Sequence, residues 1–417
     1  MRVLVDTTPL RVSPDFRRLW IGQAVSFLGS MVTTAALPYQ VFHQTHSSLA
    51  VGLLGVAQLG PLLVCSVVGG GFADRIDKRR LLLAVTLVAL ACSATLAVNA
   101  SLDHPRLWLL YALGAAASGV FAFSYPVVRS LLPLLLEDGL RPAAFALQST
   151  YGSFGMMAGP AVGGLLIGSL GLTSAYAVDV ATFAVALVAF AGIAPAPPIA
   201  VEGDMSTASF FGGLRFLRGH SVVVSVFAID LVAMVFGMPR ALFPALAVRL
   251  RGGPVLYGLL LSSVAAGAFV ASLASGWTAR VRQQGRALLV AVAAWGVAIA
   301  AAGLTHLPVL VLAMLACAGG ADMISGVYRS TITAALTPDH LRGRVSGVEL
   351  AVYAGGPVLG DIEAGVVGGL VSVPFAIVSG GAACVIGAAV FATRVRGLAT
   401  YRRRPPDRPE VAAAVAD

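Results

Sequence analysis

Several acidic residues of this chain stand inside long apolar segments, where a charged side chain is costly to bury. Asp230 and Asp322 lie well within two such segments, and Asp361 and Glu363 lie in the outer half of a third. An ion at the centre of a bilayer costs several kcal/mol, and an apolar cavity favours the neutral form of a carboxyl group. We therefore predict these four acids as candidates for binding and releasing protons within a membrane.

Each of these acids also has a structural interpretation. Asp230 can pair with Arg240 in the same segment, and Asp322 can pair with an arginine, such as Arg329 two helical turns away. Asp361 and Glu363 can serve helix packing or an outer gate. The cavity of the first half of the chain, by contrast, is expected to contain no acid at mid-membrane depth.

The apolar segments that carry these acids are long enough to cross a membrane. A spanning helix needs about 20 mostly apolar residues. In this chain 58% of the residues are hydrophobic and 11% are charged. We predict twelve spans, at residues 19–42, 49–72, 82–102, 107–131, 145–168, 172–193, 221–247, 255–278, 287–305, 307–331, 345–369 and 371–393.

The basic residues predict how these spans are oriented. Of the 28 Lys and Arg residues, all but Arg106, Arg240, Arg249 and Arg251 fall on one side of the predicted spans. Basic residues mark cytoplasmic loops, so both termini are expected inside the cell. High Ala, Gly and Arg content with a single Lys is typical of GC-rich bacterial genomes. We expect a multi-pass protein of a bacterial plasma membrane.

A polar segment at 194–220 divides the spans six and six. It predicts an N-terminal bundle at 1–193, a cytoplasmic linker with an amphipathic piece at 210–217, a C-terminal bundle at 221–393 and a disordered cytoplasmic tail at 394–417. The two bundles share an Arg-Ser pair followed by an Asp-x-Leu-Arg run, at 129–141 and again at 329–342. This repeat indicates a parallel duplication of six helices.

Composition also excludes several classes of protein. The net charge of +9 is spread over short loops, and it does not form a basic helix interleaved with aromatic residues, so nucleic-acid binding is not expected. The four cysteines lie inside apolar spans without CxxC spacing, and no pair of histidines has metal-ligand spacing. We find no nucleotide-binding loop and no nucleophile constellation, so we expect no cofactor, no metal and no enzymatic activity.

The loop between spans 2 and 3 places an acid and several cations at the inner membrane surface. It reads Gly-Gly-Phe-Ala-Asp-Arg-Ile-Asp-Lys-Arg-Arg over 70–80. Its simplest interpretation is a basic loop that sets topology. The run also resembles the loop signature of the major facilitator superfamily, with Asp77 in place of a glycine. This resemblance implies a cytoplasmic gate formed by Asp74, Arg75, Lys78, Arg79 and Arg129, in which Asp74 with Arg129 latches the two halves together.

Span 5 carries a stripe of glycines, with Gly155, Gly159 and Gly163 spaced by four residues and Pro160 and Gly164 between them. Small residues at this spacing allow close helix packing, and Pro160 is expected to bend the helix. Tight packing alone explains the stripe. It also resembles the helix motif of the antiporter branch of the superfamily, which favours export in exchange for protons.

The resemblance to the major facilitator superfamily covers the whole chain. It implies an all-α membrane protein whose twelve helices form two six-helix bundles related by pseudo-two-fold symmetry, with spans 1, 4, 7 and 10 around a central cavity. The sequence at 339–345 and 143–147 is most similar to the enterobactin-exporter and macrolide-efflux group.

These observations predict a secondary transporter that exports a small amphipathic molecule by proton antiport with alternating access. An aromatic, weakly polar cavity suits such a solute, although aromatic residues at helical spacing also serve packing. Importers and uniporters of nutrients remain alternatives, as does a non-transporting scaffold. Protons, the substrate and the bilayer are the expected partners of a monomer. The candidate cavity residues are Gln23, Tyr39, Phe123, Tyr125, Phe227, Phe236 and Arg240.

Overall fold

All regular elements in the described part of the chain are helices. The computed structural model describes residues 6–195, 219–338 and 341–402, except for the side chains of residues 67–75, 133, 343, 344, 347, 350 and 351. The elements are α1 (Thr8–Val12), α2 (Pro14–Thr45), α3 (Ser48–Arg75), α4 (Lys78–Ser101), α5 (Leu107–Leu135), η1 (Asp138–Leu140), α6 (Arg141–Leu170), α7 (Leu172–Ala191), α9 (Ser221–Gly237), η2 (Arg240–Leu242), α10 (Phe243–Arg249), α11 (Gly253–Leu273), η3 (Ser275–Arg280), α12 (Gln284–Leu304), α13 (Pro308–Leu336), α14 (Arg342–Leu370), α15 (Val373–Arg394) and α16 (Arg396–Ala399).

The long helices are the predicted membrane spans. Eleven helical segments in the described residues are long and apolar enough to cross a membrane. α14 lies beside them with 29 residues, and it is more polar because it carries Glu349, Asp361 and Glu363. The chain therefore has the expected all-α fold of twelve spanning helices.

Local sequence fixes where several of these helices begin. The Ser13 hydroxyl accepts a hydrogen bond from the Phe16 amide at 3.1 Å, and Pro14 follows as the first residue of α2. Ser372 plays the same part for α15 by accepting from the Phe375 amide at 3.3 Å. Such side chains satisfy amides that the first helical turn leaves without partners, and a proline at this position lacks the amide altogether.

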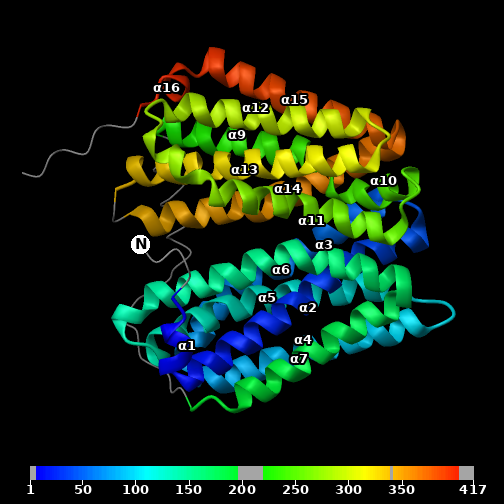
Figure 1. Cartoon of the computed structure of the whole chain (residues 1–417), viewed down its shortest axis with the longest axis vertical. Coiled ribbons are helices and arrows are strands. Elements are labelled where there is room, and N and C mark those ends of the chain that lie inside the picture. Colours follow the sequence, from blue (N-terminus) through cyan, green and yellow to red (C-terminus); the bar gives the residue numbers. More distant parts are fainter. Residues whose placement is uncertain (1–5, 196–218, 339–340, 403–417) are drawn as a thin grey trace, which may run out of the picture.

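The spans form two bundles with the same internal packing (Figure 1). In the first bundle, α2 packs on α6 and α7, while α5 packs on α3 and α4. In the second, α9 packs on α14 and α15, while α13 packs on α11 and α12. The helices of the second bundle thus repeat the neighbours of their counterparts six spans earlier, as expected for two six-helix bundles related by pseudo-two-fold symmetry.

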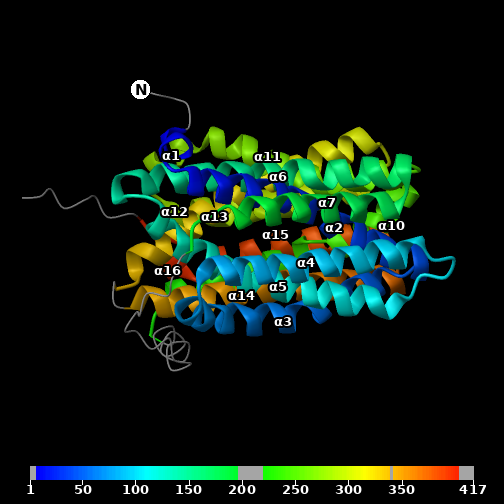
Figure 2. The ribbon, with the colours of Figure 1, turned by 90° about the horizontal axis from the view of Figure 1, so that it is seen from below.

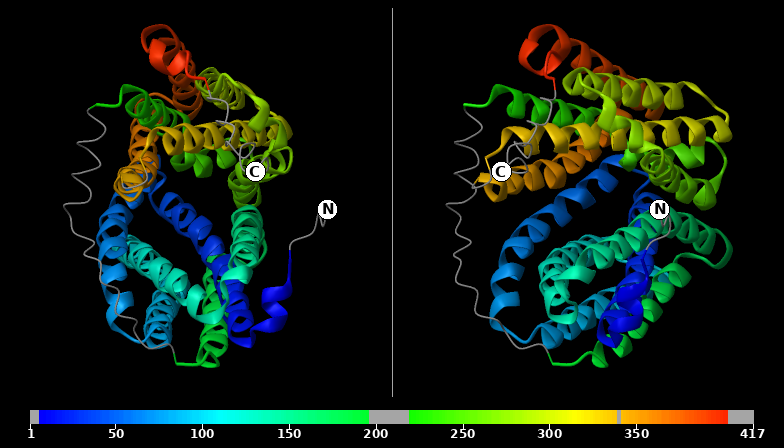
Figure 3. Two further views of the ribbon diagram at one scale, coloured as in Figure 1. Left: turned by 90° about the vertical axis from the view of Figure 1, so that its left-hand side faces the viewer. Right: turned by 60° about the vertical axis from the view of Figure 1, so that its left-hand side comes forward.

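The two bundles meet through two helix pairs, α6 with α11 and α3 with α14. α3 runs beside α14 in Figure 2. Contacts such as that of Gly52 with the Asp361 carbonyl involve the first turns of α3, at the membrane face opposite the described N-terminal residues. Towards the face that carries α1 and α16, the ribbons of the two bundles diverge, and Figure 3 views them from that face. The bundles are therefore joined at one membrane face and separated at the other.

Span 7 is not one continuous helix, which differs from the uninterrupted span expected at 221–247. α9 ends at Gly237, and the chain resumes as η2 and α10 from Arg240. Met238, with φ −112° and ψ 76°, has left the helical conformation. Pro239 has no amide to continue the hydrogen-bond ladder and disfavours a helical residue before it. The break follows from the Gly-Met-Pro sequence.

The beginning of the C-terminal tail is ordered, whereas disorder is expected from residue 394. α16 packs on the second bundle through Leu398, whose side chain is fully buried. The Gly285 amide donates a hydrogen bond to the Tyr401 carbonyl at 3.4 Å. Residues 403–417 and the linker piece at 210–217 lie outside the described residues.

Candidate functional site

A buried cluster of charges lies between spans 7, 10 and 11. Arg329 of α13 forms ion pairs with Asp230 of α9 and with Asp322, which lies two turns earlier in α13 at 3.3 Å. From α14, the Tyr353 ring lies 5.5 Å from the centre of the guanidinium, and Glu349 is within electrostatic reach of it. The sequence places these residues up to about 120 positions apart, and helix packing brings them together.

The two acids that pair with Arg329 differ in accessibility. The side chains of Asp230 and Arg329 are 2% and 6% exposed, whereas that of Asp322 is 43% exposed. Asp230 is therefore enclosed with its partner, while Asp322 borders accessible space. The structure confirms an ion pair between Asp322 and an arginine, but the suggested pair of Asp230 with Arg240 is wrong, because Asp230 pairs with Arg329 instead.

A second charge pair joins the break in span 7 to span 11. Asp361 of α14 accepts a hydrogen bond from the Ala241 amide at 3.1 Å and pairs with the Arg240 guanidinium at 3.4 Å. The carboxylate thereby partners an amide that the first turn of the resumed helix leaves open. Glu363 is half-buried nearby, and no ion pair of Glu363 is present among the described residues.

The glycine stripe of α6 serves two helix contacts. Gly155, Gly159 and Gly163 face Phe27, Met31 and Val32 of α2. Gly164 faces the other bundle, where a Cβ atom at this position would lie 2.5 Å from the Pro254 carbonyl oxygen and 3.0 Å from the Gly258 Cα of α11. α6 continues through Pro160, whose carbonyl also contacts Gly258.

The contact between α6 and α11 is supported by aromatic side chains from spans 1 and 8. The Tyr257 hydroxyl donates a hydrogen bond to the Ala35 carbonyl at 3.1 Å. The rings of Tyr39 and Tyr257 lie 5.5 Å apart. Tyr39, expected in the substrate cavity, therefore contributes to the place where the two bundles are joined.

The predicted gate residues lie on the face where the bundles diverge. Asp77 caps α4 by accepting a hydrogen bond from the Arg80 amide at 2.9 Å, which explains how the turn forms without the family's glycine. Lys78 is buried, and Arg79 donates a hydrogen bond to the Ala191 carbonyl. The Arg129 guanidinium lies 5.0 Å from the Tyr125 ring centre. The side chains of Asp74 and Arg75 lie outside the described residues.

The other candidate cavity residues divide between buried and accessible positions. Phe227 is buried against Val345 and Val348 of span 11, and Phe123 packs into the core of the first bundle. Tyr125 is exposed, Phe236 is exposed and Gln23 is half-buried. The side chain of Arg240 is 44% exposed beside Asp361. Their assignment to the lining of a substrate cavity stays a prediction.

Asp179 of α7 is an acid that the sequence interpretation missed. Its side chain is buried between three helices, where one oxygen, Oδ2, accepts hydrogen bonds from Thr33 of α2 and Ser93 of α4, each at 2.7 Å. Oδ1 has no hydrogen-bond partner among the described residues. The expectation that the cavity of the first half has no acid at mid-membrane depth did not consider an acid enclosed between helices. The signal was available, since Asp179 is the only charge in residues 172–193.

Among the described residues, no group of three or more His, Cys, Asp or Glu side chains is arranged to hold a metal ion.

The model of the transmembrane secretion effector family of the major facilitator superfamily matches residues 6–415. The chain belongs to this family. It is therefore a transporter and not an enzyme, as the loop and glycine motifs predict.

Full-length relatives support the family assignment. The chain is 26% identical over 404 residues to the enterobactin exporter EntS of Shigella boydii serotype 18, and 25% identical to that of Escherichia coli O139:H28, with 97% of each chain covered. Solved structures share the fold. A bacterial homologue of the lysosomal transporter Spinster, in an inward-facing conformation, has a TM-score of 0.69 at 16% identity, covering 94% of this chain and 98% of that one. The nucleoside transporter NupG has a TM-score of 0.74 at 12% identity, covering 90% and 98%.

Proposed function

We propose that this transporter exports a small amphipathic molecule in exchange for protons and that Asp322 carries the exchanged proton. The proposal rests on one observation, the ion pairs of a single buried arginine with two acids. The enclosed Asp230 holds Arg329 in place, and the more accessible Asp322 can lose and regain a proton. Asp361 and Glu363 then act in the outer closure rather than in proton exchange.

The charges of the cluster favour this assignment. Arg329 supplies one positive charge, whereas Asp230 and Asp322 together supply two negative charges when both are ionised. Glu349 adds a third carboxylate within reach. A net negative charge in a membrane interior is costly, so the cluster gains by holding a proton. Of the two acids that pair with Arg329, Asp322 is the one that an incoming proton can reach, because Asp230 is enclosed.

The contacts between the bundles support alternating access. The structure is joined at one membrane face by α6 with α11 and by α3 with α14, including Gly52 against the Asp361 backbone. Opening this face requires both helix pairs to separate. Protonation of Asp322 weakens its attraction for Arg329 near the middle of α13, while the Arg240–Asp361 pair stands near the contacts that must open. The two charge pairs are thus placed to link proton binding with closure.

The relatives and the glycine stripe support export as the direction of transport. The EntS proteins are named as exporters of enterobactin, and the stripe resembles the antiporter helix. With most arginines on the face where the bundles diverge, the positive-inside rule makes that face cytoplasmic. An importer or uniporter has the same architecture, so only transport measurements separate it from an exporter.

The test uses inverted membrane vesicles that contain the protein and maintain a proton gradient. A panel of antibiotics and siderophores, including enterobactin, is added, and dissipation of the gradient identifies exchanged substrates. Asp322→Asn is expected to abolish dissipation, while Asp103→Asn, at an exposed loop acid, retains it. If the protein instead accelerates the uptake of a substrate by intact cells, it is an importer.

A further inference from the structure

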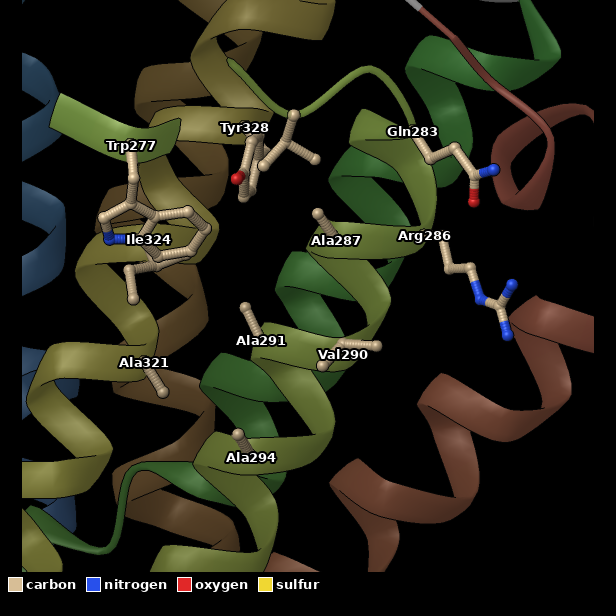
Figure 4. A pocket seen from close by; sticks show the side chains of 11 residues that line it. Trp277, Gln283, Arg286, Ala287, Val290, Ala291, Ala294, Ala321, Ile324 and Tyr328 are labelled. Atoms are coloured by element: carbon tan, nitrogen blue, oxygen red, sulfur yellow. The ribbon is translucent and has the colours of Figure 1, made fainter. Parts of the chain in front are cut away.

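A groove outside the charge cluster lies on the arginine-rich membrane face of the second bundle (Figure 4). Its volume is about 450 Å³, and it is lined by residues of η3, α12 and α13. Ala287, Ala291 and Ala294 form one wall along α12, and Ala321 and Ile324 form the wall on α13. These two walls of the groove are therefore apolar and consist mostly of small side chains.

The groove opens to the lipid surface of the protein. Trp277 at one edge is 49% exposed, and Val290 on α12 is 62% exposed. Exposed apolar side chains on a spanning helix face the hydrocarbon. From Gln283 to Ala294 the helical rise is about 16 Å, which is close to the depth of one leaflet of a bilayer about 30 Å thick.

The polar side chains of Gln283 and Arg286 lie at the shallow end of this groove. Gln283 and the exposed Arg286 stand at the start of α12, where the helix dipole favours an anion. None of the lining residues is acidic. Arg280 and Arg282 lie just before α12, so the surrounding charge is positive.

One buried donor in the groove lacks a partner. The Tyr328 side chain is 1% exposed, and its hydroxyl has no hydrogen-bond partner among the described residues. It lines both the groove and the small polar pocket beside it, which includes Thr278 and Gln284. A buried hydroxyl without a partner costs about 1–3 kcal/mol, so a ligand oxygen at this place is favourable.

We propose that the groove binds one anionic phospholipid of the adjacent leaflet. The phosphate group sits at Gln283, Arg286 and the start of α12, an ester oxygen accepts the Tyr328 hydrogen bond, and an acyl chain lies along the alanine wall. Basic pockets between spanning helices at the cytoplasmic face bind anionic headgroups in this way. This site is separate from the proposed proton and substrate sites.

Trp277 provides a built-in reporter for the test. The full-length protein is placed in nanodiscs that contain brominated phosphatidylglycerol or brominated phosphatidylethanolamine, and quenching is compared between wild type and Trp277→Phe to isolate the Trp277 signal. We expect phosphatidylglycerol to quench Trp277 at several-fold lower mole fraction. Arg286→Gln should remove this preference, and Ala294→Phe should reduce quenching by filling the groove.

Arg282→Gln is the matched control, because it removes the same charge from an exposed position just before α12 that does not line the groove. It is expected to retain the preference. Equal quenching by the two lipids, or equal losses in Arg282→Gln and Arg286→Gln, would overturn the proposal. Relief of the quenching by added enterobactin would also overturn it, because the groove would then belong to the substrate. Thermal melts of each variant check that the fold is intact.

Discussion

The guanidinium of Arg329 and the carboxylate of Asp230 form an ion pair in which both side chains are almost completely buried. The pair joins α13, which packs on α11 and α12, to α9, which packs on α14 and α15. A buried charge that loses its partner is far more costly than an absent pair. This relationship makes Asp230 an anchor for the arginine that Asp322 also contacts.

The anchoring role predicts a non-additive pattern of stability. Arg329→Met alone should destabilise the protein by about 3–5 kcal/mol, because it leaves the buried Asp230 without its partner. Asp230→Leu alone should cost less, because Arg329 keeps its ion pair with Asp322. The double variant should be more stable than the sum of the two losses implies. Thermal unfolding of the purified proteins measures this, and strictly additive losses would show that the pair is not energetically coupled.

Asp322 is expected to behave differently from Asp230. Because its side chain is 43% exposed, Asp322→Asn should leave the unfolding temperature within a few degrees of wild type while removing proton exchange. Asp230→Asn should also abolish proton-linked transport, since it releases the arginine that Asp322 contacts. Full transport activity in both variants would exclude the cluster from the mechanism.

The close approach of α6 to α11 predicts a strict size limit at Gly164. Gly164→Ala places a Cβ atom 2.5 Å from the Pro254 carbonyl oxygen, so the joined face should no longer close and transport should fall at least about tenfold, equivalent to about 1.4 kcal/mol. Gly152→Ala is the control in the same helix, because a Cβ atom there meets open space. Normal transport by Gly164→Ala would show that this contact does not form during the cycle.

Asp179 is expected to be a structural acceptor in the first bundle. Both hydroxyl donors use Oδ2, so Asp179→Asn keeps an acceptor at that position and should retain stability and transport. Asp179→Leu leaves two buried hydroxyls without their acceptor, at about 1–3 kcal/mol each, and should lower the unfolding temperature. A stable but inactive Asp179→Asn protein would instead indicate that the charge or its proton takes part in transport.

The cytoplasmic latch implied by the loop motif remains a prediction about Asp74. Asp74→Asn should slow turnover with little change in apparent substrate affinity, because the residue would act in closing the inner face rather than in binding. Transport rates over a range of substrate concentrations separate these effects. An unchanged maximal rate would count against the latch.

The sequence predicts the fold of this chain better than it predicts which charged side chains form ion pairs. Span length and the distribution of arginines are local properties, so the twelve helices and the two halves could be read directly. The partner of Asp230 could not, because Arg329 lies 99 positions further along the chain and their contact depends on how α9 and α13 rotate against each other. Arg240 was the predicted partner because it is only ten positions from Asp230 in the sequence. In the structure the helix breaks at Pro239, and Arg240 pairs with Asp361 instead.

The helix break in span 7 and the buried Asp179 could both have been predicted from the sequence. The Gly-Met-Pro run at 237–239 indicates a helix break, yet continuous hydropathy conceals it. Asp179 stands alone in an otherwise uncharged span, and its hydroxyl partners come from two other helices. The depth of an acid can be predicted from sequence, whereas the groups that satisfy it depend on tertiary packing.

Proton exchange in inverted vesicles tests the central claim most directly. With a substrate identified from the panel, the wild-type protein and Asp103→Asn should dissipate an imposed proton gradient on substrate addition, and Asp322→Asn should not, at equal amounts of folded protein. Substrate-dependent dissipation that persists in Asp322→Asn at the wild-type rate would contradict the assignment of the exchanged proton to this acid.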